Sequence, residues 1–184
     1  NFYALSSYYL GSFFSPLVYF FNVQSMPDAV YLITLLKFGA IGLSAYISLH
    51  GIFSKIPRCL VLTLSTSFAL MSFAISQIEI KTWLDVFILA PLILYGFKKL
   101  IYNEGEVLYF ISLTSLFIQN YYFGFMMSIF LILWYLTQLS WNIKKIGKRF
   151  FHFVIVSLLS VITSLVMLYP TFLDLRTHGE SFSK

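Results

Sequence analysis

A long uncharged stretch restricts this chain more than any other feature. The 35 residues from Val107 to Trp141 contain no charged side chain. As one helix they would measure about 52 Å, whereas the hydrocarbon core of a bilayer is about 30 Å thick. A polar break at Gln119-Asn120, with Gly124 nearby, divides the stretch. It therefore predicts a helical hairpin, with a short span over 107–118 and a longer span over 122–141.

The composition of the whole chain indicates a lipid environment. Of its 184 residues, 59% are hydrophobic and only 10% are charged, whereas a soluble domain has roughly 25% charged residues. The net charge of +5 does not indicate nucleic-acid binding, because the basic residues form short clusters between apolar runs. The single Cys59 leaves no partner for an internal disulfide and is expected to be inert.

The remaining apolar segments complete an all-α, polytopic membrane fold with about six transmembrane helices. The further spans are expected over Ala29–Leu49, Cys59–Ile78, Trp83–Phe97 and Phe150–Tyr169. Pro91 should break the third span, and Pro170 should end the last one. The predicted organisation is an interfacial or re-entrant loop over 1–27, a helical domain over 28–170 and the start of a loop over 171–184. Because the chain begins without Met and stops in a polar stretch, we expect a fragment of a larger protein.

The basic residues predict the orientation, because cytoplasmic loops of membrane proteins are rich in Lys and Arg. With six crossings, one side collects eight basic residues: Lys55, Arg58, Lys98, Lys99, Lys144, Lys145, Lys148 and Arg149. The other side has Lys81, Arg176 and Lys184, together with most of the acidic residues. The first side is therefore predicted to be cytoplasmic. The 1–27 and 171–184 loops and Asn120 are predicted to be extracytoplasmic.

Two carboxylates near the start of the third span are candidate catalytic groups. Asp85 could act as a general base or a metal ligand at the outer membrane face. Alternatively, Thr82-Trp-Leu-Asp85 fits a capping box, in which Asp85 would only satisfy the helix end. Glu79 is the second candidate, and a solvated surface carboxylate is the alternative for it.

Lys37 and the Asn120-Tyr121-Tyr122 group are candidate substrate-binding residues. Lys37 lies about 13 Å past Asp28 along the predicted helix, near mid-membrane. An anionic partner such as a lipid phosphate would explain its charge there, and snorkelling to the surface is the alternative. Asn120, Tyr121 and Tyr122 could bind sugar hydroxyls and sugar faces, or the tyrosines could belong to an aromatic belt. No pair of His residues has metal-ligand spacing, so no metal ligand is assigned.

Several short motifs recur in order across nearly the whole chain and resemble one bacterial family. They are Ser15-Pro-Leu17, Leu36-Lys-Phe-Gly39, Trp83-Leu-Asp85 running into Ala90-Pro-Leu92, and Asn120-Tyr-Tyr-Phe-Gly-Phe125. The chain resembles the YfhO family of multi-pass membrane proteins.

The resemblance implies a GT-C-type glycosyltransferase in the cell membrane. It would move a sugar from a polyprenyl-phosphate carrier to a cell-wall polymer such as lipoteichoic acid, at the extracytoplasmic face. Asp85 and Glu79 would then be the acidic residues of the second outer loop, and Lys37 would suit the carrier phosphate. The resemblance leaves open whether a divalent metal takes part. The alternatives are a transporter or flippase of lipid-linked sugars, and a structural subunit without a site.

Overall fold

The computed structural model describes residues 12–78, 81–141 and 147–179. Two short 3-10 helices, η2 and η3, precede the first long helix, and a third, η4, precedes the last helix. Across the described residues the elements are η2 (Ser15–Phe20), η3 (Val23–Ser25), α2 (Met26–Ile52), α3 (Arg58–Ala69), α4 (Ser72–Ser76), α5 (Lys81–Tyr102), α6 (Val107–Gln119), α7 (Tyr121–Trp141), η4 (Gly147–Arg149) and α9 (Phe150–Gly179).

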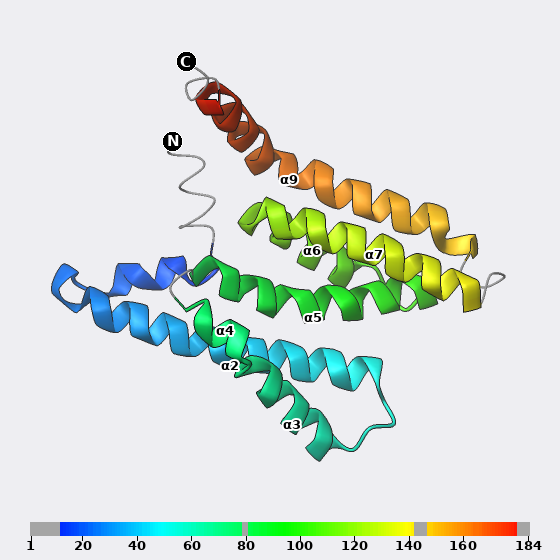
Figure 1. Ribbon diagram of the computed structural model, residues 1–184, viewed down its shortest axis with the longest axis horizontal. Helices are drawn as coiled ribbons and strands as arrows, with labels where there is room; N and C mark the ends of the chain where they lie inside the picture. The colour runs from blue at the N-terminus through cyan, green and yellow to red at the C-terminus, as the bar shows by residue number, and fades with distance from the viewer. Residues whose placement is uncertain (1–11, 79–80, 142–146, 180–184) are drawn as a thin grey trace.

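Figure 1 shows the helices side by side, with α3 at one edge of the molecule, α9 at the other, and α2 between α3 and α5. α2 packs against α3 on one side and against α5 on the other, α5 packs against α6, and α6 packs against both α7 and α9. The chain reverses direction from each span to the next, so α2 and α5 run the same way (Figure 1). The starts of α2, α5 and α7 therefore lie at one end of the bundle, and the starts of α3, α6 and α9 lie at the other.

Length and hydropathy mark most of these helices as membrane spans. Four described segments are long and apolar enough to cross a bilayer: Val23–Ile52, Arg58–Ser76, Tyr121–Leu139 and Phe150–Pro170. α6 is a shorter apolar helix, and α5 has the length of a span but carries Asp85, Lys98 and Lys99. Large apolar side chains such as Leu133 and Val166 are exposed on the outside of the bundle, as expected for a surface that contacts lipid. The predicted all-α polytopic fold, with roughly six transmembrane helices, is confirmed.

An aromatic and aliphatic core joins α5, α6, α7 and α9. Its ring contacts include Phe97 with Phe153 at 5.5 Å between centroids, and Tyr135 stacked on Phe153 at 5.0 Å. Gly96 lets α5 and α6 approach closely, because a Cβ atom there would lie 2.6 Å from the backbone nitrogen of Tyr109. Small residues at such crossings are typical of helix packing in lipid, where close backbone approach supplies much of the attraction.

The predicted hairpin is confirmed, and the expectations for two prolines are wrong. α6 ends at Gln119 and α7 begins at Tyr121, so the uncharged stretch divides at Asn120. α5, however, runs from Lys81 through Pro91 to Tyr102, and α9 continues through Pro170 to Gly179. Proline removes one backbone donor, but leaving the helix inside lipid would expose many more unpaired backbone groups.

The second predicted span contains a break that the sequence did not indicate. α3 ends at Ala69, and the chain resumes as the short helix α4 at Ser72. Met71 has extended backbone angles at this point. The division of the chain into an outer loop, a helical domain and a second loop remains a prediction.

Candidate functional site

Four α2 side chains form a stripe that leads to Lys37. Met26, Val30, Ile33 and Lys37 are spaced by four, three and four residues, which places them on one face of a helix. Lys37 lies about three turns from the start of α2, and the three residues before it in the stripe are apolar. The helix therefore carries one cation at the inner end of an apolar stripe.

Asp85 meets Lys37 from the neighbouring helix α5. Lys37 Nζ donates a hydrogen bond to Asp85 Oδ2 over 2.8 Å. The side chains of Lys37 and Asp85 are only 1% and 2% exposed. Asp85 lies about one turn from the start of α5, so the pair sets the first turns of α5 beside the third turn of α2.

Because the Lys37–Asp85 pair is buried, its geometry has a large effect on the stability of the protein. Two charges removed from water each carry a large desolvation cost, which their attraction offsets only when the geometry is good. Asp85 Oδ1 is also buried and accepts no hydrogen bond from the described residues, although the Ser12 hydroxyl approaches the carboxylate. The ring of Phe14 lies on another side of Lys37, with its centroid 5.9 Å from Nζ, a distance typical of a cation–π contact.

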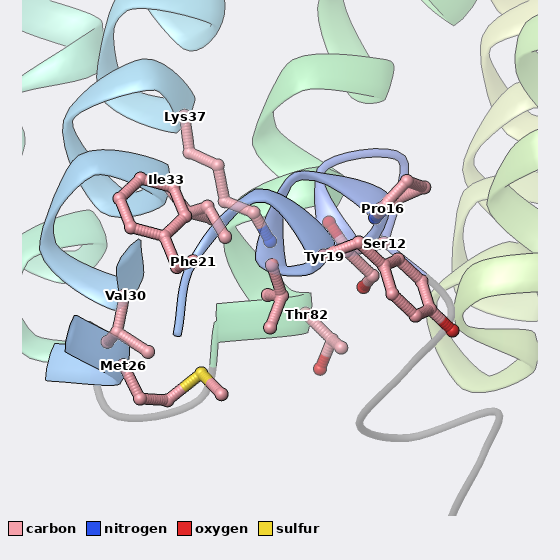
Figure 2. A pocket seen from close by; sticks show the side chains of 11 residues that line it. Ser12, Pro16, Tyr19, Phe21, Met26, Val30, Ile33, Lys37 and Thr82 are labelled. Atoms are coloured by element: carbon pink, nitrogen blue, oxygen red, sulfur yellow. The ribbon is translucent and has the colours of Figure 1, made fainter. Parts of the chain in front are cut away.

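A cavity of about 770 Å³ opens beside Lys37. The segment before α2, the stripe on α2 and the start of α5 line it. Its described wall consists of Ser12, Ser15, Pro16, Val18, Tyr19, Phe21, Met26, Val30, Ile33, Lys37 and Thr82. Figure 2 shows the Lys37 nitrogen pointing away from α2, between Phe21 and Ile33 on one side and Tyr19 and Ser12 on the other. We call the end of the bundle that holds this cavity the cavity end.

The cavity wall combines one cation with hydroxyl groups and apolar surface. The hydroxyls come from Ser12, Ser15, Tyr19 and Thr82. Asp85 is not part of the described wall and reaches the cavity through Lys37. Such a wall suits an amphiphile with one anionic group, because the ammonium can pair with the anion while the apolar side chains cover a hydrocarbon chain.

In the structure, Asp85 is not a helix cap and Lys37 does not reach the membrane surface, which were the alternatives that the sequence left open for them. Asp85 does not cap α5, because Thr82 already lies inside the helix and the Asp85 carboxylate bonds to Lys37. Lys37 does not snorkel to the surface, because its side chain is buried against Asp85. Glu79 lies outside the described residues.

The Asn120 group lies at the cavity end but away from the cavity wall. Asn120 Oδ1 accepts a hydrogen bond from the backbone N–H of Phe123 over 3.2 Å, as an N-cap residue does. Tyr121 and Tyr122 are exposed at the start of α7. None of the three lines the cavity beside Lys37. In the described part of the chain, no three His, Cys, Asp or Glu side chains come together as metal ligands.

Sequence reasoning missed the pairing of Lys37 with Asp85 and the contribution of the 12–21 segment to the cavity. A signal for the pair was present. Lys37 is the only charge inside the first predicted span, and Asp85 is the only acidic residue inside the third. Because a lone charge in lipid is costly, two opposite charges in separate spans indicate a contact between those helices. Ser15 belongs to the Ser15-Pro-Leu17 motif, but nothing in the sequence indicated that Ser12, Ser15 or Tyr19 would line a cavity beside Lys37.

Comparison with known proteins places the chain in one family. No curated protein and no solved structure matches it. The family described as "Bacterial membrane protein YfhO" matches residues 1–184, the whole of the chain. This chain therefore belongs to the YfhO family of bacterial membrane proteins.

Proposed function

We propose that this chain forms part of an extracytoplasmic glycosyltransferase. It would move a sugar from a polyprenyl-phosphate carrier to a cell-wall polymer such as lipoteichoic acid. The observation that carries the proposal is the Lys37 ammonium in the wall of a largely apolar cavity within a membrane bundle. A phosphate joined to an isoprenoid chain has the two chemical parts that this wall is suited to bind.

The proposed chemistry is direct displacement at the anomeric carbon. An acceptor hydroxyl oxygen forms the new bond to that carbon, and the bond from the carbon to the carrier phosphate breaks. The electron pair of the broken bond stays on the phosphate oxygen, where Lys37 stabilises the added negative charge. The proton of the acceptor hydroxyl passes to a carboxylate, for which Glu79 is the candidate from this chain, because Asp85 does not line the cavity.

Asp85 has a positioning role in this proposal through its bond to Lys37. The 2.8 Å contact holds the ammonium in one place. It also compensates the Lys37 charge before a carrier binds, so an empty cavity does not leave a lone cation in lipid. An arriving phosphate then shares the ammonium with Asp85.

The distribution of basic residues supports an extracytoplasmic cavity. Arg58 begins α3, Lys98 and Lys99 lie in the last turns of α5, and Arg149 precedes α9. The starts of α3 and α9 and the end of α5 lie at the end of the bundle opposite the starts of α2 and α5 (Figure 1), so all four residues lie away from the cavity end. By the positive-inside rule that opposite end is cytoplasmic.

The proposal is tested with full-length protein reconstituted in vesicles and supplied with a polyprenyl-phosphate sugar. The decisive variant is Lys37→Met combined with Asp85→Leu, which removes both charges and leaves no unpaired ion. We expect this double variant to remain folded and to lose sugar transfer by at least about 100-fold, since one electrostatic contact to the reacting group is worth roughly that much.

Lys99→Met is the matched control, because it removes a lysine from the opposite end of the bundle, keeps the hydrogen bonds of Lys98 to α2 and should leave transfer nearly unchanged. Normal transfer by the folded double variant would overturn the proposal. If wild-type vesicles moved donor across the bilayer but attached no sugar to the acceptor, the flippase function would replace it.

A further inference from the structure

A second group of polar atoms at the cavity end has no role in the mechanism above. Both amide atoms of the Gln119 side chain, Nε2 and Oε1, are buried and have no hydrogen-bond partner among the described residues. The same holds for the indole Nε1 of Trp83. Gln119 is only 2% exposed. Buried polar groups almost always find partners, because burying them unpaired costs stability.

Phe123 contacts Trp83 and belongs to the corner between α6 and α7 that begins at Gln119. Its ring meets the ring of Trp83 edge-to-face, with 5.2 Å between the centroids. Its backbone N–H is bonded to Asn120, the residue after Gln119. Trp83 at the start of α5 and Gln119 at the end of α6 therefore belong to one region, where α5, α6 and α7 meet.

The Gln119 side chain is not needed to cap the neighbouring helix end. Asn120 supplies the oxygen that caps α7, so the neighbouring amide is not required at the helix end. Gln119 also differs from Thr114, an α6 residue whose buried hydroxyl likewise has no partner in the described part of the chain. A threonine hydroxyl can rotate onto a carbonyl of its own helix, whereas an amide has two donors and an acceptor to satisfy.

We propose that Gln119 and Trp83 form a subsite for the hydroxyl groups of a sugar. An amide offers both a donor and an acceptor, and an indole adds a second kind of donor. Neither residue is charged, and the ring of Phe123 packs against Trp83, so the group favours a neutral, hydroxyl-rich ligand over an anion. This inference rests on the proposed function, from which it takes the sugar as ligand.

The position of the subsite agrees with its proposed role. Three residues in the first turns of α5 each contact a different part of this region. Thr82 lines the cavity, Trp83 meets Phe123, and Asp85 bonds to Lys37. The start of α5 thus lies between the proposed phosphate site and the proposed sugar subsite.

The test measures binding of free sugars, without catalysis. Full-length protein in nanodiscs is titrated with glucose, galactose and N-acetylglucosamine, and binding is followed by thermal stability and tryptophan fluorescence. We expect at least one sugar to stabilise the wild type. Gln119→Met should weaken its affinity about 10-fold, the effect of losing one or two hydrogen bonds. Without sugar, Gln119→Met should be at least as stable as wild type, because it removes an unpaired amide.

Thr114→Val is the matched control, since it removes another buried unpaired group from α6 and should leave sugar affinity unchanged. Trp83→Phe, which keeps an aromatic ring and removes the N–H, should weaken affinity. The subsite is overturned if no sugar stabilises the wild type, if Gln119→Met binds as tightly, or if that variant is less stable without sugar.

The transfer assay separates the two proposals. If the wild type transfers sugar, and Gln119→Met shows the same transfer and the same sugar affinity, only the subsite is refuted. Absence of transfer in the wild type would refute the glycosyltransferase, and the titration would still decide whether the sugar binds.

Discussion

At the scale of single residues, the Lys37–Asp85 pair couples stability to the site. The two side chains come from helices separated by two chain reversals, and both are almost completely buried. Each ion is tolerated in the bundle because the other is present. The same ammonium also lines the cavity, so one contact serves both the packing of α2 on α5 and the proposed binding of phosphate.

Removing only one partner of the pair should therefore destabilise the protein strongly. We expect Lys37→Met to lower the free energy of unfolding by about 3–5 kcal/mol, because it leaves the Asp85 carboxylate buried without a counter-ion. Adding Asp85→Leu to this variant should restore most of the loss. Thermal unfolding in detergent measures both effects. Equal stability of Lys37→Met and the wild type would show that the pair does not hold α2 and α5 together.

At the scale of helices, side chains near the helix ends hold the bundle together. Asn120 caps α7 with its side-chain oxygen. At the opposite end, Lys98 on α5 donates hydrogen bonds to the carbonyls of Ile52, over 2.6 Å, and Gly51, over 3.3 Å. These are among the last carbonyls of α2, which lack partners within their own helix. A cation also interacts favourably with the negative end of a helix.

The cap at Asn120 gives a prediction about the hairpin. Asn120→Ala should lower the free energy of unfolding by about 1 kcal/mol, the usual value of an N-cap side chain. Asn120→Asp should retain the cap and most of the stability. If instead Asn120→Ala lost sugar binding without losing stability, Asn120 would act on the ligand, as the sequence motif suggested, and its capping role would be minor.

At the scale of the whole molecule, the alternating helices separate two chemically different ends. One end holds the cavity, the buried ion pair and the buried amide of Gln119. The opposite end holds the clustered basic residues, together with a contact between the His152 imidazole and the Glu106 carboxylate. This separation is the basis for assigning one end to each side of the membrane.

Chemical labelling of cysteines tests that assignment. Cys59 is the only cysteine of this chain and is exposed at the start of α3. An impermeant maleimide should not label it in intact cells but should label it after permeabilisation, once any cysteine outside this chain is replaced. A Gln24→Cys, Cys59→Ser variant should show labelling in intact cells, because Gln24 is exposed at the cavity end. The reverse pattern would invert the predicted topology.

The sequence by itself determined the membrane class and most of the helical spans. Hydropathy was sufficient to predict these features because a chain can cross lipid in very few backbone conformations. Backbone groups must bond within a helix, and the bilayer fixes the length of the span. The hairpin over Val107–Trp141 could be predicted for that reason. The continuation of α5 through Pro91 could not, because helix propensity measured in water overstates the effect of a proline within lipid.

Only the tertiary structure decided which polar side chains meet. Lys37 and Asp85 were each recognised as unusual, but their contact depends on α2 and α5 lying side by side, which hydropathy does not specify. Asn120 and Gln119 are neighbours of similar chemistry, and the sequence favoured Asn120. In the structure the Asn120 side chain accepts a hydrogen bond from the backbone of α7, whereas the amide of Gln119 has no partner among the described residues. Local patterns fix where a helix lies in the membrane, whereas the partner of a buried polar group is fixed by which helix packs beside it.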